Sequence, residues 1–133
     1  MKYMLDTNIC IFIIKNKPEN VLRQLKSKRS EGLSISAITL AELEHGVAAS
    51  AYPEKNALAL LKFMVIADCL PFFQQAAAEY GRIRNNLQKK GTPIGTMDML
   101  IAAHAKSLGL TLVTNNTREF SRVEGLRIED RVN

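Results

Sequence analysis

The amino-acid sequence predicts an α/β protein in which a mainly parallel sheet of four to five short strands is covered by helices on both faces. Short apolar stretches of strand length alternate with longer stretches of helical periodicity, a pattern typical of parallel strands joined by right-handed crossovers. Gly and Pro residues separate most of these stretches. We therefore expect a three-layer sandwich, formed by residues 1–133 as a single domain with its own core.

The first quarter of the chain predicts a strand followed by two helices. Residues 2–5 are apolar enough for a buried strand, and Thr7 or Asn8 can cap a helix over 9–15. Pro18 suits the first turn of a second helix that ends near Lys28. Asp6 would then lie at the carboxyl end of the first strand.

The middle of the chain repeats this alternation. Residues 33–36 predict a second strand, and a helix begins at Thr39. Pro53 starts a further helix, and residues 68–70 could form a brief strand that ends before Pro71.

The last third predicts the longest helix and a final strand. Residues 74–90 have helical character, and Thr96 caps a helix over 97–108. Residues 111–114 predict another strand, after which 115–117 must turn the chain. Ligands of parallel sheets collect at the carboxyl ends of the strands, which is where Asp6 and this turn belong.

Charge and cysteine content narrow the class of protein. Eighteen Lys and Arg against thirteen Asp and Glu leave a net charge of +5, which favours a polyanionic partner but equally fits solvated faces. Both cysteines lie in apolar stretches, which predicts free thiols in a reducing cytosol. We see no signal peptide or membrane span and expect a cytoplasmic protein. The basic residues group at 23–29, 82–90 and 118–131.

Asp6 and Asp98 are the two aspartates flanked by long apolar stretches. Burying such carboxylates is costly unless a positive group meets them, and a shared metal ion is the simplest such group. Their hard oxygen ligands fit Mg²⁺ or Mn²⁺, and the His and Cys spacings of a zinc site are absent. The isolated His45 and His104 are weaker candidates for ligands.

Further polar residues could complete such a site. Pattern alone does not separate Glu42 from Glu44, and Glu119 could equally pair with a neighbouring Arg. Asn116 could orient a carboxylate or serve its own turn. Thr7 and Thr114 could each donate a hydrogen bond to a metal ligand, although a cap or strand role explains them as well.

Four short motifs in series resemble those of PIN domains, and within that superfamily the chain is similar to VapC-type toxins. The likeness covers nearly the whole chain in the right order. The motifs are MLDTN at 4–8, SAITLAEL at 36–43, PIG at 93–95 with Asp98 and IAAHA at 101–105, and VTNNTREF at 113–120.

The resemblance implies an endoribonuclease that needs Mg²⁺ or Mn²⁺, is inhibited by a VapB-type antitoxin and usually forms a homodimer, with larger toxin–antitoxin assemblies possible. It implies structured RNA as substrate, with the anticodon stem-loop of initiator tRNA the leading candidate. It assigns the family's acids to Asp6, Glu42 rather than Glu44, and Asp98. The antitoxin would lay a helix or tail along a groove between the first two and the fourth helical segments.

One motif departs from the family pattern, because Asn116 stands where many PIN domains carry an aspartate. Glu119 is the candidate to supply the missing charge, and the change puts a second metal ion in doubt. The alternative function is a non-catalytic RNA-binding or partner-binding domain of the same fold. A phosphate-handling α/β enzyme is disfavoured, because no second acid follows Asp6 at the spacing that such sites use.

Overall fold

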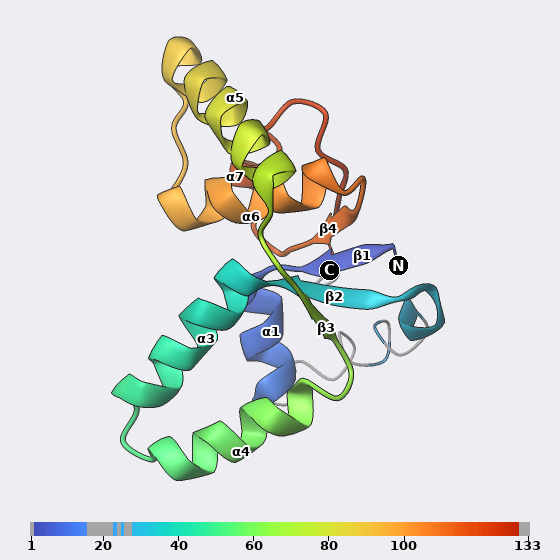
Figure 1. Cartoon of the computed structure of the whole chain (residues 1–133), viewed down its shortest axis with the longest axis vertical. Helices are drawn as coiled ribbons and strands as arrows, with labels where there is room; N and C mark the ends of the chain where they lie inside the picture. Colours follow the sequence, from blue (N-terminus) through green and yellow to red (C-terminus); the bar gives the residue numbers. More distant parts are fainter. Residues whose placement is uncertain (1, 16–22, 24, 26–27, 131–133) are drawn as a thin grey trace.

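The computed structural model describes residues 2–15, 23, 25 and 28–130. Within these residues five strands form one parallel sheet, with β1 at its centre (Figure 1). The order across the sheet is β3-β2-β1-β4-β5. The strands are β1 (Tyr3–Leu5), β2 (Leu33–Ser36), β3 (Asp68–Leu70), β4 (Thr111–Val113) and β5 (Ile128–Glu129).

Helices cover both faces of this sheet, which confirms the predicted three-layer arrangement (Figure 1). In the described part of the chain, no helix is long and apolar enough to span a bilayer. The lower face in Figure 1 carries α1 (Thr7–Ile14), α3 (Ala37–Ala49) and α4 (Pro53–Phe63). The upper face carries α5 (Gln74–Lys90), α6 (Thr96–Ser107) and α7 (Thr117–Phe120), and a short 3₁₀ turn at Arg29–Glu31 precedes β2.

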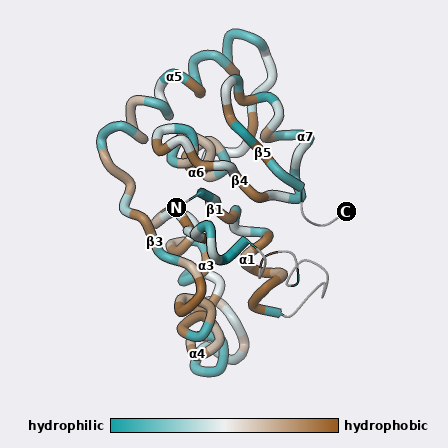
Figure 2. Tube along the Cα trace, turned by 90° about the vertical axis from the view of Figure 1, so that its right-hand side faces the viewer, coloured by the Kyte–Doolittle hydropathy of each residue, from teal (hydrophilic) through white to brown (hydrophobic). Residues whose placement is uncertain are grey.

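The strands divide the core into two hydrophobic clusters because successive side chains point to opposite faces. In β1, Tyr3 and Leu5 join the cluster under α1, α3 and α4, whereas Met4 joins the cluster under α5 and α6. Hydrophobic residues follow α1 and β4 along the trace in Figure 2. Burial on both faces explains why the central strands β1 and β4 read as short, mainly apolar runs.

Three predicted helix starts were wrong by one to a few residues. Asp6, not Thr7 or Asn8, caps α1, because its carboxylate accepts the N–H of Ile9. Ser36 caps α3, so this helix begins at Ala37, two residues before the predicted start at Thr39. Helix α6 begins at Thr96 after an N-cap at Gly95, whereas Thr96 was the predicted cap. The second predicted helix, from Pro18 to Lys28, falls largely on residues outside the described ranges.

A glycine inside α5 offers a test of this helix assignment. Gly81 lies in the helix interior with no atom within 4 Å of an added Cβ. Replacing Gly81 by Ala should therefore raise the free energy of unfolding by about 0.5–1 kcal/mol, measured by denaturant titration. Gly91, the C-cap of the same helix, has equally open space but a φ of +67°. The matched Gly91→Ala variant should lose stability, and equal effects of the two substitutions would contradict this account.

Candidate active site at the carboxyl edge of the sheet

Asp6 lies where the central strand β1 ends and is held from two sides. Only 3% of the residue is exposed. Its Oδ1 accepts the backbone N–H of Ile9 at 2.9 Å, and its Oδ2 accepts the hydroxyl of Thr114 at 2.5 Å. Thr114 follows the neighbouring strand β4, and its Oγ1 also accepts the N–H of Asn116 at 2.9 Å. These contacts fix the orientation of the Asp6 carboxylate.

Glu42 reaches the same edge from helix α3. The hydroxyl of Thr7, the residue after Asp6, donates to Glu42 Oε1 at 2.6 Å. The Thr7 hydroxyl also lies 3.3 Å from the hydroxyl of the fully buried Thr39, one turn earlier on α3. Glu44 is exposed on the same helix, so the structure brings Glu42 and not Glu44 to Asp6. Sequence reasoning missed Thr39 in this contact, although its spacing of three residues from Glu42 places both on consecutive turns.

Asp98 and Glu119 come from two further elements. Asp98 is half-buried in the first turn of α6, beside Gly95. Glu119 lies on α7, and its Oε2 accepts the side-chain N–H of Asn116 at 3.2 Å. The Asn116 side chain therefore contacts an acid, whereas the turn is closed by the Thr114 hydroxyl and not by an Asx-type bond from Asn116 itself.

The electrostatics show that these carboxylates lie within reach of one another. Burial, together with the charges of Asp98 and Glu42, raises the pKa of Asp6 to about 6 despite its hydrogen bonds to Thr114 and Ile9. Burial also raises the pKa of Asp98, with added repulsion from Glu119 and Glu42. In the described part of the chain, the ion pairs use other acids, so this cluster keeps its excess negative charge.

A divalent cation fits the chemistry of this cluster. Its donors are carboxylate and amide oxygens, which suit Mg²⁺ or Mn²⁺ and not Zn²⁺. Among the described residues, no three acidic, His or Cys side chains stand close enough to form a ready-made metal site. Mg²⁺ keeps several of its waters, so acids that stand apart can still hold it partly through water.

The two histidines are not placed as ligands. His45 is exposed on α3, and His104 is fully buried with its Nδ1 2.7 Å from Ser36 Oγ. Both cysteines are free, as the sequence predicted.

An apolar groove begins beside Glu42 and runs away from the acidic cluster. It encloses about 630 Å³ between α1, α3 and α4. Two of its walls, α1 and α4, are the first and fourth predicted helical segments, and α3 forms a further wall. The second predicted segment lies largely outside the described residues. The groove is lined mainly by apolar side chains and backbone, among them Ile11, Ile14, Leu43, Gly46, Val47 and Leu60.

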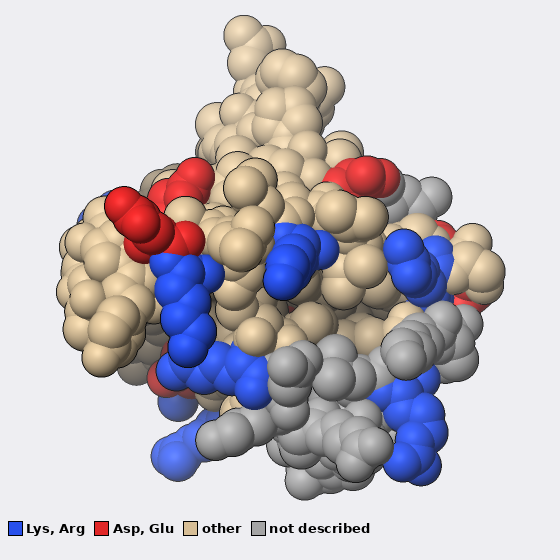
Figure 3. Space-filling model, turned by 90° about the horizontal axis from the view of Figure 1, so that it is seen from below, with Lys and Arg blue, Asp and Glu red and all other residues tan. Residues whose placement is uncertain are grey.

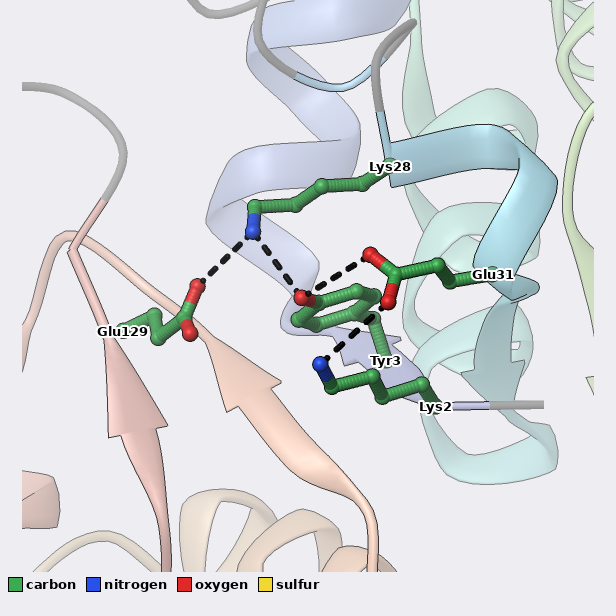
Figure 4. A network of polar contacts seen from close by, with 5 residues as sticks. All are labelled: Lys2, Tyr3, Lys28, Glu31 and Glu129. Carbon is green, nitrogen blue, oxygen red and sulfur yellow. Dashed lines mark hydrogen bonds and ion pairs between the residues drawn. The ribbon is translucent and has the colours of Figure 1, made fainter.

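Several basic residues that the sequence grouped as possible RNA contacts have partners within the chain. Lys28 donates to the hydroxyl of Tyr3, the first residue of β1, at 3.0 Å and pairs with Glu129, the last residue of β5, at 3.1 Å (Figure 4). On the upper face, Arg82 pairs with Glu79, and Lys90 pairs with Glu124. Figure 3 shows that the Lys and Arg side chains on the lower face are spread among uncharged ones. These clusters therefore serve the fold at least in part.

Comparison with known proteins agrees with this geometry. The model of the PIN domain family matches residues 3–126. The chain is 48% identical, over 98% of both sequences, to the tRNA(fMet)-specific endonuclease VapC of Salmonella typhimurium. It also superposes on the crystal structure of DNA-bound VapBC from that organism with a TM-score of 0.93 and 48% identity, covering 98% of each chain.

A second solved structure is equally similar in shape. VapBC2 from Rickettsia felis, bound to a DNA fragment from its promoter, matches with a TM-score of 0.93 and 38% identity over 98% of each chain. Matches of this identity and coverage extend over nearly the whole chain, including all four acid-bearing elements. The chain therefore belongs to the PIN-domain family and, within it, to the VapC proteins.

Proposed function

We propose that this protein is an endoribonuclease that requires Mg²⁺ or Mn²⁺ and acts as the toxin of a type II toxin–antitoxin pair in the cytoplasm. The observation that carries the proposal is the meeting of Asp6, Glu42, Asp98 and Glu119 at the carboxyl edge of the sheet without a basic partner in the described residues. Similarity to a tRNA(fMet)-specific endonuclease makes initiator tRNA the leading substrate. A homodimer is the expected assembly.

In the proposed mechanism, Asp6 and Asp98 hold the metal ion. When bound, the metal lowers the pKa of a water molecule and neutralises charge on the phosphate. Thr114 keeps Asp6 in place through its hydroxyl hydrogen bond. The low exposure of Asp6 keeps bulk water from screening its charge, which strengthens its attraction to a cation.

The remaining polar residues act on the attacking water. Glu42, held by the Thr7 hydroxyl, accepts the proton of the water or orients it. Asn116 and Glu119, which are joined by a hydrogen bond near Asp98, would hold a second ion or a water. Attack by water leaves a 5′-phosphate and a 3′-hydroxyl on the cut RNA, whereas attack by the ribose 2′-hydroxyl would leave a 2′,3′-cyclic phosphate.

We also propose that the apolar groove beside Glu42 holds a helix or tail of a VapB-type antitoxin. Both solved relatives described above are complexes named VapBC. A groove with apolar walls on three helices suits the apolar face of an amphipathic helix. Because Glu42 lies at one end of it, an occupant would also reach the acidic cluster.

The function is tested by mapping RNA ends. Purified protein is incubated with total RNA and with initiator tRNA, in Mg²⁺, in Mn²⁺ and in excess chelator. Specific cuts with 5′-phosphate ends that need the metal support the proposal. Binding of RNA without cleavage in any metal would favour the alternative, a non-catalytic RNA-binding domain, and cyclic phosphate ends would reject the mechanism.

Two glutamates on α3 allow a sharp test of which acid faces the site. Glu42→Gln should lower the cleavage rate by about 100-fold or more, because it removes the group that accepts the proton from the water. Glu44→Gln is the matched control on the same helix and should keep the wild-type rate, since its side chain is exposed. Single-turnover cleavage of a labelled tRNA measures both. Loss of activity in Glu44→Gln alone would reverse the assignment.

A further inference from the structure

The buried imidazole of His104 lies at the point where two acid-bearing elements meet. His104 is on α6, which carries Asp98, and its Nδ1 lies 2.7 Å from the hydroxyl oxygen of Ser36. Ser36 ends β2 and caps α3, the helix that carries Glu42. The ring also packs edge-on against Phe72, which follows β3, with centroids 5.2 Å apart. The residue thus contacts three elements of the fold at once.

The hydrogen bonds around Ser36 determine which nitrogen of His104 carries the proton. Ser36 Oγ already accepts the N–H of Ile38 at 3.0 Å, so its hydroxyl hydrogen is free to donate to Nδ1. Nε2 is buried and makes no regular hydrogen bond within the described residues, yet the Pro71 carbonyl is near enough to raise the pKa of the ring. A Ser36 hydroxyl that donates to Nδ1 leaves the ring proton for Nε2. We therefore assign His104 the neutral tautomer protonated on Nε2.

Burial supports the neutral form, because desolvation lowers the pKa of His104. A charged imidazolium would offer a second donor to Ser36, whose own hydroxyl hydrogen would then need another acceptor. The contact between α6 and α3 is thus an uncharged hydrogen bond between two buried side chains. Such a bond constrains direction more tightly than apolar packing does, because its energy depends steeply on angle.

The contact continues toward the acidic cluster along α3. Ser36, Thr39 and Glu42 are spaced three residues apart and follow one another on successive turns. Thr39 and Glu42 both meet the Thr7 hydroxyl, next to Asp6. A shift of the amino end of α3 would consequently move Glu42 relative to both Asp6 and Asp98.

We propose that His104, by accepting a hydrogen bond from Ser36, is a positioning residue that holds the Glu42-bearing helix α3 in register with the Asp98-bearing helix α6. This inference rests on the proposed nuclease function, since the geometry it maintains is that of the proposed acids. It assigns His104 no contact with RNA or metal.

Two substitutions at position 104 separate positioning from packing. His104→Phe keeps a ring against Phe72 but cannot accept the Ser36 hydroxyl, and it should lower kcat about 10-fold or more with little change in KM. His104→Asn loses ring volume but offers an oxygen near the place of Nδ1, and it should restore kcat to within about three-fold of wild type. The proposal would be overturned if the loss of kcat in the two variants paralleled their loss of folding stability. It would also be overturned if His104→Phe were fully active.

A control and an independent measurement complete the experiment. Leu87→Ala removes a buried side chain from α5, and it should cost about 2–5 kcal/mol of stability without lowering kcat. If Phe at position 104 prevents folding, Ser36→Ala breaks the same contact, together with the cap of α3 at Ile38, and should lose at least as much kcat. Nitrogen NMR of the wild-type ring should find the proton on Nε2, and a proton on Nδ1 would contradict the inference whatever the activity.

A wild-type protein that cleaves no RNA contradicts the proposed function, whereas an active wild type with an equally active Ser36→Ala contradicts the positioning role alone.

Discussion

Replacing Asp6 by Asn should leave a folded protein whose RNA cleavage is slower by at least about 1,000-fold. The substitution removes one negative charge from the proposed metal site and almost no volume. Asn is also a good N-cap, and its side-chain oxygen can still accept the N–H of Ile9. The loss of activity should therefore come from the lost charge and not from unfolding of α1.

The same substitution should change how stability depends on pH when a chelator is present. The pKa of Asp6 is about 6 in the folded protein and near 3.8 in the unfolded chain. Between these values the folded state binds more protons, so this group makes the protein less stable as the pH rises from about 4 to 6. Above pH 6 the penalty is complete, on the order of 3 kcal/mol before any cation binds. The Asp6→Asn substitution removes this stability penalty, because Asn carries no ionisable group.

Thermal unfolding in chelator and in Mn²⁺, from pH 4 to 8, measures this effect. Wild type should lose stability with rising pH in chelator and regain it with Mn²⁺. Asp6→Asn should show a smaller change with either, the remainder coming from Asp98, whose pKa is also raised by burial. Asp68→Asn is the matched control, because Asp68 is an exposed acid at the start of β3, at the amino edge of the sheet. It should behave as wild type. Full cleavage activity in Asp6→Asn would remove Asp6 from the mechanism.

Much of the architecture could be predicted because its signals are local. A strand buried on both faces reads as a short apolar run, and the Gln74–Lys90 helix ends at a glycine whose φ of +67° suits a C-cap. Strand β5 could not be predicted in this way. It has two residues and owes its existence to pairing with β4, where Leu112 lies opposite Ile128. The caps at Asp6 and Ser36 were missed because neighbouring Thr and Asn residues are equally good caps by type.

The residues of the site also differ in whether the neighbouring sequence identifies them or only a contact with a distant segment does. Asp6 and Asp98 stand out in the sequence because apolar stretches flank them. The choice between Glu42 and Glu44 could not be made from pattern, since both lie on α3 and their difference comes from where α1 crosses it. Thr7 on α1 supplies the contact that selects Glu42. His104 carried no signal of its place, because its partner Ser36 is 68 residues away.

Filling the apolar groove should release the toxin from its antitoxin without weakening the nuclease. Gly46 lies on α3 in the groove wall, and an added Cβ there meets no atom within 4 Å. Gly46→Leu places a branched side chain into the space proposed for the antitoxin. It should weaken antitoxin binding by at least about 100-fold, equivalent to roughly 3 kcal/mol, because a central contact of the interface can no longer form.

The matched control is Gly46→Ala. Both substitutions should stabilise α3 by up to about 1 kcal/mol, since Gly is a poor helix former, but Ala leaves most of the 630 Å³ groove open. Gly46→Ala should therefore bind the antitoxin nearly as wild type does. Stability alone cannot produce a difference between the two variants, so a difference in inhibition reports on the groove itself.

Titration of tRNA cleavage with a VapB-type antitoxin that inhibits the wild-type protein, supported by calorimetry, measures the effect. Gly46→Leu should cut tRNA at the wild-type rate when alone and should continue to cut at antitoxin concentrations that silence wild type and Gly46→Ala. Slower cleavage by Gly46→Leu alone would mean that the leucine disturbs Glu42, one turn away on α3, and a shorter side chain such as Val would then be needed at this position. Normal inhibition of an active Gly46→Leu would show that the antitoxin silences the acids from another surface, because no helix could share the groove with the added side chain.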